Sequence, residues 1–547
     1  MAQQPLYRLK SSTAIEPLVN KWMAWSHVIA PVVSSLHLRN YQTELLRSFI
    51  DNPQLHVDAC KIPRLRSGHV MDLPAERVDE VKDFLLNTEA EQADNLRFAE
   101  SAIAFHNQLA NETEGYSLEP YYARLPEELR GYVELLYDYY DHPIVRFFEG
   151  MLYRSGYYKK QLQSFRLVKQ HDDHRPFFMN TPRLPQPGEI HWNMSFDSPE
   201  VDQLFQLDNR PQPLGHIREL LDLPVAAEKS LLPLLTTAPG PEYDAPPEAT
   251  PRIRYLGHAC VLIEWQGISI LTDPSVGVLP ENAGAERFTY EDLPERLDYV
   301  LITHAHQDHF CLESLLRLRH KIGCLVVPRA NGIFYGDLSL ALLARTIGFK
   351  NVMEVDAIES IAIPDGEIVA IPFLGEHADL PYAKTAYVVC MDRNRVLFAA
   401  DSDCLDQEIY QHVRRLLGPI QTVFLGMECV GAPLSWSSGS LLPRQPKHSV
   451  DQSRRYKGCD SNRGSILLEA VGAERLYIYA MGLEPWLEFL LGLAYTPDAT
   501  QIKEAQRFLR LAREAGLVEA RLLSGKQELY LDSVPHERSV SFSTSTV

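Results

Sequence analysis

The sequence lacks three features that define common classes of protein. None of its eight cysteines stands in a CxxC pair, and no secretory signal opens the chain, so we expect reduced thiols in a cytoplasmic protein. No apolar run approaches the roughly 20 residues that span a bilayer, which excludes a membrane-spanning helix. Positive charge is also scarce: 53 basic residues face 72 acidic ones, for a net charge of −19, which disfavours nucleic acids as partners.

What is present is a chain long enough for several domains. It has 547 residues, of which 45% are hydrophobic, so a sizeable core is expected. Apolar residues recur at helical spacing between positions 78 and 105, which predicts a separate, mixed but helix-rich domain over residues 1–235. Repeated prolines predict a linker over residues 236–251. Short strands alternating with helices then predict an α/β domain over residues 252–547.

A stretch rich in histidine follows an apolar strand that we predict over residues 297–302. His304 and His306 stand two residues apart and can reach one metal ion, while Asp308 and His309 can turn toward a second. Two ions about 3.5–4 Å apart are the arrangement that activates an oxygen species between metals. The alternative, a polar surface loop that is merely rich in histidine, is disfavoured because this spacing at a strand end is specific.

Further side chains that can bind metal stand at the ends of later predicted strands. Glu376 or His377 follows one strand, Asp401 follows the next hairpin, and His448 lies in a later loop. Ligands that come from separate strand ends are held in fixed geometry by a rigid sheet. Glu428 also follows a strand on this side and is a possible pocket residue, although a surface carboxylate is an equally good interpretation.

Residues 252–482 resemble the metallo-β-lactamase fold, a four-layered αββα sandwich. The resemblance rests on Gly257-His258, Thr272-Asp273-Pro274, the histidine stretch, Asp401 and His448. It implies that His304 and His306 bind the first ion, that Asp308, His309 and His448 bind the second, and that Asp401 bridges both. It also implies that Asp273 orients a histidine rather than binding metal.

The last ligand of the first ion departs from the hydrolases of this fold, which carry a histidine there. Glu376 and His377 are adjacent, so their side chains cannot easily both point inward. A glutamate ligand would make the site richer in oxygen donors, which favours iron over zinc. The whole chain, with Gly375-Glu376-His377-Ala378-Asp379 after its linker, resembles the dinuclear-iron β-hydroxylases of nonribosomal peptide pathways, such as that of chloramphenicol biosynthesis, in which a glutamate occupies this position.

That resemblance implies an antibiotic-pathway monooxygenase with two iron ions, O2 as co-substrate and an external electron donor. Its substrate would be an amino acid held as a phosphopantetheine thioester on a peptidyl carrier domain, and the hydroxyl group would enter at Cβ. The N-terminal domain would cover the site and contribute to a homodimer. The metal centre would carry the chemistry, so no separate acid or base is named.

Two other functions fit the same motifs. A dizinc hydrolase would share a hydroxide between its ions and attack an ester, lactone or phosphodiester. His377 rather than Glu376 at the metal would favour that alternative. A binding protein that kept the fold and lost its chemistry is disfavoured by the full set of ligand candidates.

Overall fold

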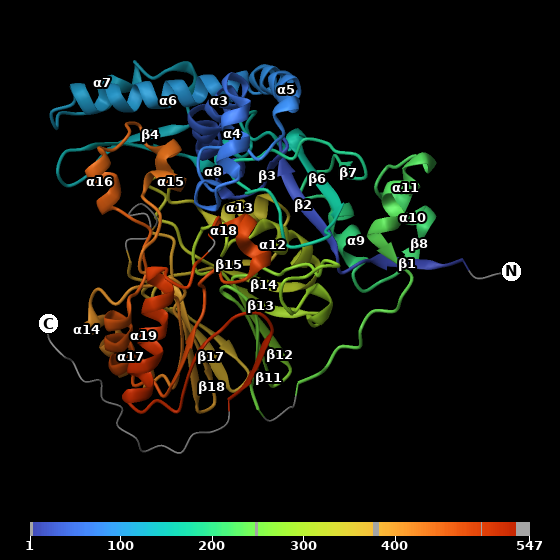
Figure 1. Ribbon diagram of the computed structural model, residues 1–547. Coiled ribbons are helices and arrows are strands. Elements are labelled where there is room, and N and C mark those ends of the chain that lie inside the picture. The colour runs from blue at the N-terminus through green and yellow to red at the C-terminus, as the bar shows by residue number, and fades with distance from the viewer. Residues whose placement is uncertain (1–3, 247–249, 376–381, 494, 532–547) are drawn as a thin grey trace.

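The computed structural model describes residues 4–246, 250–375, 382–493 and 495–531. Figure 1 shows two parts, an N-terminal half above and a sandwich of two sheets below. Glu376 and His377, which decide the expected ligand of the first ion, lie outside the described residues.

Two seven-stranded sheets face each other in the C-terminal half. The first has the order β15 (Val352–Val355), β14 (Ile322–Pro328), β13 (Leu297–Leu301), β12 (Ile268–Thr272), β11 (Cys260–Trp265), β10 (Arg252–Gly257), β23 (Gln527–Tyr530). The second has the order β16 (Ser360–Ile363), β17 (Gly366–Ile371), β18 (Ala386–Met391), β19 (Asn394–Phe398), β20 (Thr422–Leu425), β21 (Arg475–Ile478), β22 (Glu519–Leu522).

Strand alternation divides the apolar side chains between three layers of core. In β11, Val261 and Ile263 point between the two sheets, whereas Leu262 points to the outer side of the first sheet. That outer side carries α12 (Leu312–Leu318) and α13 (Leu340–Thr346). The outer side of the second sheet carries α14 (Gln407–Leu417), α17 (Ser461–Val471) and α19 (Thr500–Glu514). The αββα sandwich expected from the sequence is confirmed.

The N-terminal half is mixed and rich in helix, as expected. Its main sheet has the order β3 (Trp22–Met23), β2 (Thr13–Val19), β6 (Gln163–Lys169), β7 (Ile190–Trp192). A small sheet joins β8 (Gln212–Pro213), β1 (Leu6–Leu9), β9 (Leu235–Thr236), and a ribbon joins β4 (Val133–Tyr137) to β5 (Pro143–Phe147). The helices include α1 (Ser26–Ile29), α2 (Pro31–His37), α3 (Thr43–Asp51), α4 (Pro53–Cys60), α5 (Val78–Glu91), α6 (Ala93–Glu112), α7 (Glu119–Tyr122), α8 (Glu149–Leu152), α9 (Pro199–Gln206), α10 (Leu214–Leu220), α11 (Glu228–Leu231).

The two halves share one continuous hydrophobic core. A single cluster of buried side chains runs from β2 and α2 through α6 to α12 and the outer side of the first sheet. The described residues 237–246, in contrast, form no helix or strand and run along the outside of the molecule (Figure 1). The halves are therefore linked in sequence by a segment without regular structure, and they are held together in space by their shared core.

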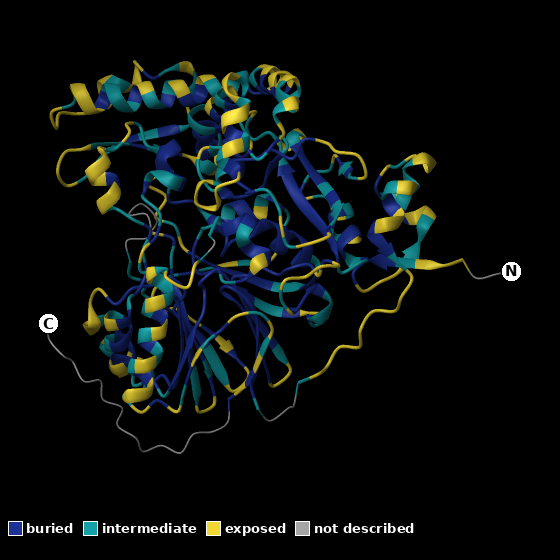
Figure 2. Ribbon diagram, in the orientation of Figure 1, coloured by how far each residue is buried: buried dark blue, intermediate teal, exposed yellow. Residues whose placement is uncertain are grey.

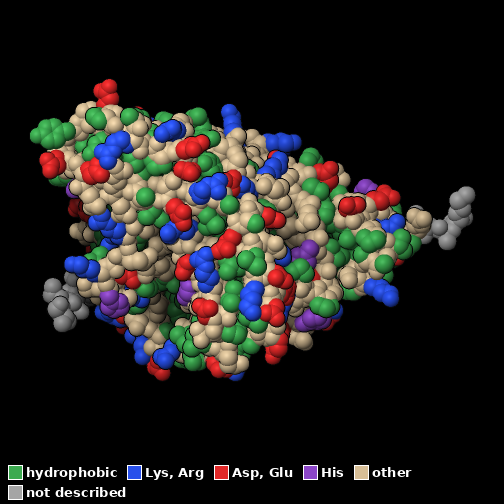
Figure 3. Space-filling view, turned by 90° about the horizontal axis from the view of Figure 1, so that it is seen from above, with side chains coloured by type: hydrophobic (Ala, Val, Ile, Leu, Met, Phe, Trp, Pro, Cys, Tyr) green, Lys and Arg blue, Asp and Glu red, His purple; other side chains and the backbone are tan. Residues whose placement is uncertain are grey.

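Exposure to solvent differs between the strands and the outer helices. Figure 2 shows strands that are largely buried, while α14 and α19 keep an exposed side. On the face seen in Figure 3, acidic and basic side chains are mixed rather than gathered by sign. Among the described residues, no helix is both long enough and apolar enough to cross a membrane.

Candidate metal centre

The histidine stretch forms a loop that Asp273 fixes in place. Asp273 follows β12, and Thr303 follows β13, the parallel neighbour of β12. The backbone N–H and the hydroxyl group of Thr303 each donate a hydrogen bond of 2.7 Å to the Asp273 carboxylate. One buried carboxylate therefore joins the ends of two strands and sets where the following histidines begin.

The same carboxylate orients His309, the role expected for Asp273. Nδ1 of His309 lies 2.8 Å from Asp273 Oδ2, so this nitrogen carries the proton and donates it. Nε2 is then left facing carboxylate oxygens of Asp401 at 3.1 Å and Asp308 at 3.6 Å. Nε2 is buried, and no described residue makes a hydrogen bond to it. A lone pair that faces two carboxylates is stable only if a positive charge lies between them.

His304 is oriented in a similar way by Thr303. Since the Thr303 hydroxyl group donates to Asp273, it accepts from Nδ1 of His304 at 3.0 Å. This leaves Nε2 of His304 directed at Nδ1 of His306, at 3.0 Å. Two nitrogens that each lie about 2.1 Å from one ion are separated by roughly this distance, so the pair fits a common metal.

Asp401 lies between the two halves of the cluster. Its Oδ2 atom is 3.6 Å from Nε2 of His304 and 3.1 Å from Nε2 of His309. Two groups of side chains meet here closely enough to hold an ion each: His304, His309 and Asp401, and His258, Asp308 and His309. His309 belongs to both groups, so the donors could hold two neighbouring ions, with Asp401 beside His304 and His309.

His258 is a residue of this cluster that the sequence analysis did not place there. Its Nε2 atom lies 2.9 Å from Asp308 Oδ2, and both side chains are buried. Burial alone would raise the pKa of Asp308, but His309 and His258 lower it below its usual value. Burial would likewise lower the pKa of His309, yet Asp401, Asp308 and Asp273 raise it well above the usual range. The cluster therefore demands a cation, and a bound metal can supply it in place of protons.

The two remaining candidates, His448 and Glu428, differ in whether they lie near the cluster. His448 begins α16 (His448–Ser453), is exposed, and belongs to neither candidate group, so the structure does not bring this expected ligand to the cluster. The chain after β20 makes a long excursion through α15 (Ser435–Ser438) and α16, which carries His448 away from the strand ends (Figure 1). Glu428, three residues after β20, stays close: burial, Asp401 and Asp308 raise its pKa well above the usual value.

A cavity of about 390 Å³ opens onto the cluster. His306, Asp308, Asp401 and Glu428 line it together with an apolar wall that includes Trp436. The N-terminal half completes this wall, because Trp436 Nε1 donates to the backbone oxygen of Ser67 at 3.0 Å. The cavity thus offers a substrate the candidate metal ligands on one side and apolar side chains on another.

Comparisons with known proteins agree with this geometry. Residues 8–239 match the model of the diiron non-heme beta-hydroxylase N-terminal domain, and residues 252–414 match a beta-lactamase superfamily domain. A 4-amino-L-phenylalanyl-[CmlP-peptidyl-carrier-protein] 3-hydroxylase of Streptomyces venezuelae is 32% identical over 531 residues, which cover 94% of this chain and 98% of that protein. The chain belongs to the diiron non-heme β-hydroxylase family.

Structural similarity extends over the whole β-hydroxylase chain. The crystal structure of CmlA, a diiron β-hydroxylase from S. venezuelae, covers 97% of this chain at 31% identity, with a TM-score of 0.90. A metal-dependent hydrolase of Methanopyrus kandleri, at 31% identity, matches only 22% of this chain and 46% of its own length. The protein is an O2-dependent diiron oxygenase, with two iron ions as its cofactor. Among the described residues, the cluster around Asp401 contains side chains that could bind metal ions.

Proposed function

We propose that this β-hydroxylase inserts a hydroxyl group at Cβ of an amino acid held on a peptidyl carrier domain of a nonribosomal peptide synthetase, in an antibiotic pathway. The observation that carries the proposal is the similarity to a carrier-dependent 3-hydroxylase over 94% of the chain, including both halves. The hydrolase alternative has weaker support, since the metal-dependent hydrolase of Methanopyrus kandleri matches only 22% of the chain. The match of residues 8–239 to the β-hydroxylase N-terminal domain also supports the hydroxylase.

The proposed ligands are His304, His306, Asp308, His309 and Asp401, with Glu376 as the expected ligand outside the described residues. Bound iron would supply the reduction of O2 and the attack on the C–H bond. The protein's own contribution is orientation: Asp273 holds His309, Thr303 holds His304, and His258 holds Asp308. Partners of this kind fix the tautomer and direction of a metal ligand.

The cavity beside the cluster would take the amino-acid side chain. Trp436 packs against Phe177 of the N-terminal half, with ring centroids 6.0 Å apart, so the wall is built from both halves. Ser26 of α1 donates to the backbone oxygen of Ala305 at 3.4 Å, inside the histidine loop itself. The N-terminal half would therefore exclude water from the reacting atoms and hold the loop in position.

The remaining partners are parts of the same proposal. An external electron donor supplies the electrons that O2 reduction requires, and the enzyme works as a homodimer in the cytoplasm. All eight cysteines are free thiols, six of them buried, which agrees with a reducing compartment.

The activity is tested with iron-loaded protein, a chemical reductant and a carrier domain loaded with 4-amino-L-phenylalanine or another aromatic amino acid. The expected product is the carrier-bound amino acid with one additional oxygen atom, which becomes heavier when isotopically heavy O2 is supplied. Mass spectrometry of the carrier checks both results. Release of the amino acid by thioester hydrolysis, equally fast with zinc-loaded protein and without O2, would instead establish the hydrolase.

The metal site is tested by the iron content of two variants. Asp401→Asn removes the shared carboxylate, so we expect loss of most bound iron and of the iron absorption spectrum. His448→Ala changes an exposed histidine and should retain both ions. If His448→Ala lost one ion while Asp401→Asn kept two, the proposed ligand set would be wrong.

A further inference from the structure

A second cavity lies at the seam between the two halves, away from the metal cluster. Its volume is about 820 Å³, compared with about 390 Å³ for the cavity at the cluster, and the two share no lining residue. One wall comes from β5 and α8 of the N-terminal half, and the other from residues 332–346 of the sandwich, including α13. Sites for small molecules typically occupy roughly 300–1,000 Å³ and often lie between domains.

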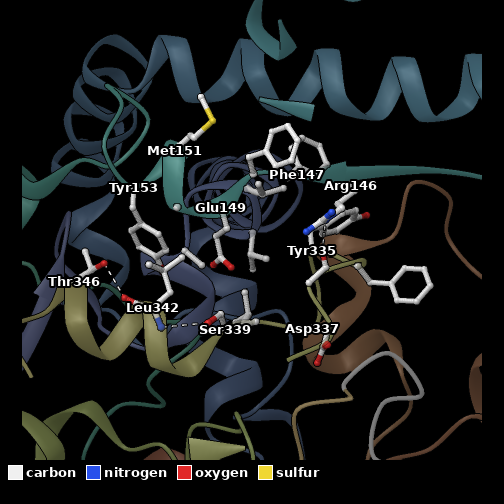
Figure 4. Close-up of a pocket in the computed structure, with 18 of the residues that line it drawn as sticks. Arg146, Phe147, Glu149, Met151, Tyr153, Tyr335, Asp337, Ser339, Leu342 and Thr346 are labelled. Atoms are coloured by element: carbon white, nitrogen blue, oxygen red, sulfur yellow. Dashed lines mark hydrogen bonds between the residues drawn. The ribbon is translucent and has the colours of Figure 1, made fainter. Parts of the chain in front are cut away.

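Two buried polar groups in this cavity have no partner among the described residues. They are Oε1 of Glu149 and the hydroxyl group of Tyr153, both on or next to α8. Figure 4 shows the Glu149 carboxyl group near the middle of the lining, with Tyr153 on one side and Tyr335 on the other. Buried polar atoms are almost always hydrogen-bonded, so the carboxylate oxygen and the hydroxyl group in this cavity are groups that a bound ligand could satisfy together.

The electrostatic environment of Glu149 explains what kind of ligand it requires. The pKa of this carboxyl group is raised to about 7: burial is the main cause, nearby Asp337 adds to it, and the backbone N–H of Ser339 opposes the shift. Arg146, which also lines the cavity, does not pair with Glu149, because it donates to Glu134 at 3.0 Å and to the backbone oxygen of Gly332 at 2.9 Å. A ligand that brings a positive charge would remove the cost of ionising Glu149.

The other acidic group of the cavity is already satisfied. Asp337 accepts backbone N–H groups from Asn331, Tyr382 and Ala383, each at 2.8 Å. Two further cations, Arg154 and Arg345, line the cavity but are exposed to solvent. Glu149, which is half-buried but whose Oε1 atom is buried, is therefore the acidic group that is left to select a ligand, and the buried Tyr153 hydroxyl group lies in the same cavity.

The rest of the lining is aromatic and apolar. Phe147, Phe148, Phe334 and Tyr335 all contribute to the walls, together with Met151 and Leu342. The faces of aromatic rings attract cations, by about 0.5–2 kcal/mol for each well-placed ring. From these contacts we infer that the cavity binds a small organic ammonium ion with an apolar body, whose nitrogen is bound by Glu149 and Tyr153.

The inference is tested by calorimetric titration of the iron-loaded enzyme with phenethylamine, using hydrocinnamate as a probe of the same shape with the opposite charge. We expect the amine to bind and the acid to bind at least tenfold more weakly. Glu149→Gln should weaken binding of the amine at least tenfold, because the charge is lost while the shape is kept. Tyr153→Phe should weaken it severalfold.

Two further variants distinguish this cavity from the one at the metal cluster. Phe334→Ala removes a partly exposed ring from the seam cavity and should also weaken amine binding, and it serves if Glu149→Gln does not fold. Trp436→Ala alters only the cavity at the cluster and should leave amine binding unchanged. The inference is overturned if the amine does not bind, if hydrocinnamate binds more tightly, or if only Trp436→Ala weakens the binding.

Discussion

Helices α12 and α14 occupy corresponding layers of the sandwich, yet their environments are opposite. All seven residues of α12 are buried, including Glu313 and Arg317, because the N-terminal half packs over this helix. In α14, only Tyr410 and Val413 are buried, and its charged residues face solvent. The comparison shows that the N-terminal half covers one outer layer of the sandwich, whereas water contacts the other.

The charges of α12 are tolerated because each has a partner from the N-terminal half. Glu313 accepts from Arg175 at 2.7 Å, and Arg175 also donates to Glu16 of β2 at 2.6 Å. Arg317 forms two hydrogen bonds, of 2.8 and 2.6 Å, to Asp208. Buried ion pairs add little net stability, but they are costly to break and so fix one register between packed surfaces.

The largest effect is expected from Glu16→Gln. This carboxylate is fully buried and is paired with Arg166, Arg175 and Arg183, so its neutralisation leaves three guanidinium groups without their shared anion. We expect a loss of about 3–5 kcal/mol in the free energy of unfolding. Chemical denaturation measures this loss.

The matched control for that substitution is Glu408→Gln in α14. Glu408 is exposed, so the same chemical change should alter stability by less than about 0.5 kcal/mol. Equal losses of stability in Glu16→Gln and Glu408→Gln would mean that the cover provided by the N-terminal half does not raise the cost of removing a charge.

A smaller effect is expected from Arg317→Met, which keeps the length of the side chain and removes its charge. Asp208 would lose both hydrogen bonds, and the contact of the guanidinium group with the Tyr290 ring, at 4.1 Å, would also be lost. We expect a loss of about 2–3 kcal/mol. Arg415→Met in α14 is the control, and a comparable loss there would contradict the comparison.

The alternation of short strands with helices predicted an α/β domain, and the resemblance to the metallo-β-lactamase fold predicted its sandwich of two sheets. The histidine loop and Asp401 followed from the same reasoning, since each comes directly after a short apolar strand. The burial of α12 could not be predicted in this way. Glu313 and Arg317 lie four residues apart, a spacing typical of an exposed helix, and their partners are more than 100 residues away in the sequence.

His448 and His258 illustrate the same limit at the metal centre. Residue type and order in the chain favoured His448 as a late ligand, but the excursion after β20 depends on packing against the N-terminal half. His258 was noticed as part of a motif, yet its contact with Asp308 depends on a positive φ of 51° that turns the chain after β10. Local patterns predict which side chains can bind metal, whereas long-range packing decides which ones meet.

The pH dependence of stability should have opposite signs for two carboxyl groups at the seam. Burial opposes ionisation of Glu16, but Arg183, Arg166 and Arg175 bring its pKa well below 4.5. The stability that Glu16 contributes is therefore complete above pH 4.5 and is lost as the pH falls through its pKa in the folded state. Unfolding free energies of wild type and Glu16→Gln should differ most near pH 7 and converge in acid.

Glu149 should show the opposite sign, because its pKa is raised from 4.5 to about 7 without a paired cation. Between these values the unfolded chain loses its proton first, so wild-type stability falls as the pH rises from 4.5 to about 7. Glu149→Gln should thus match wild type in stability at pH 4.5 and be more stable than wild type at pH 8. Saturating phenethylamine should remove the advantage of the variant, since it supplies the cation that Glu149 lacks and Glu16 has. Denaturation at the two pH values, with and without the amine, measures this difference, and a variant that is less stable than wild type at pH 8 would contradict it.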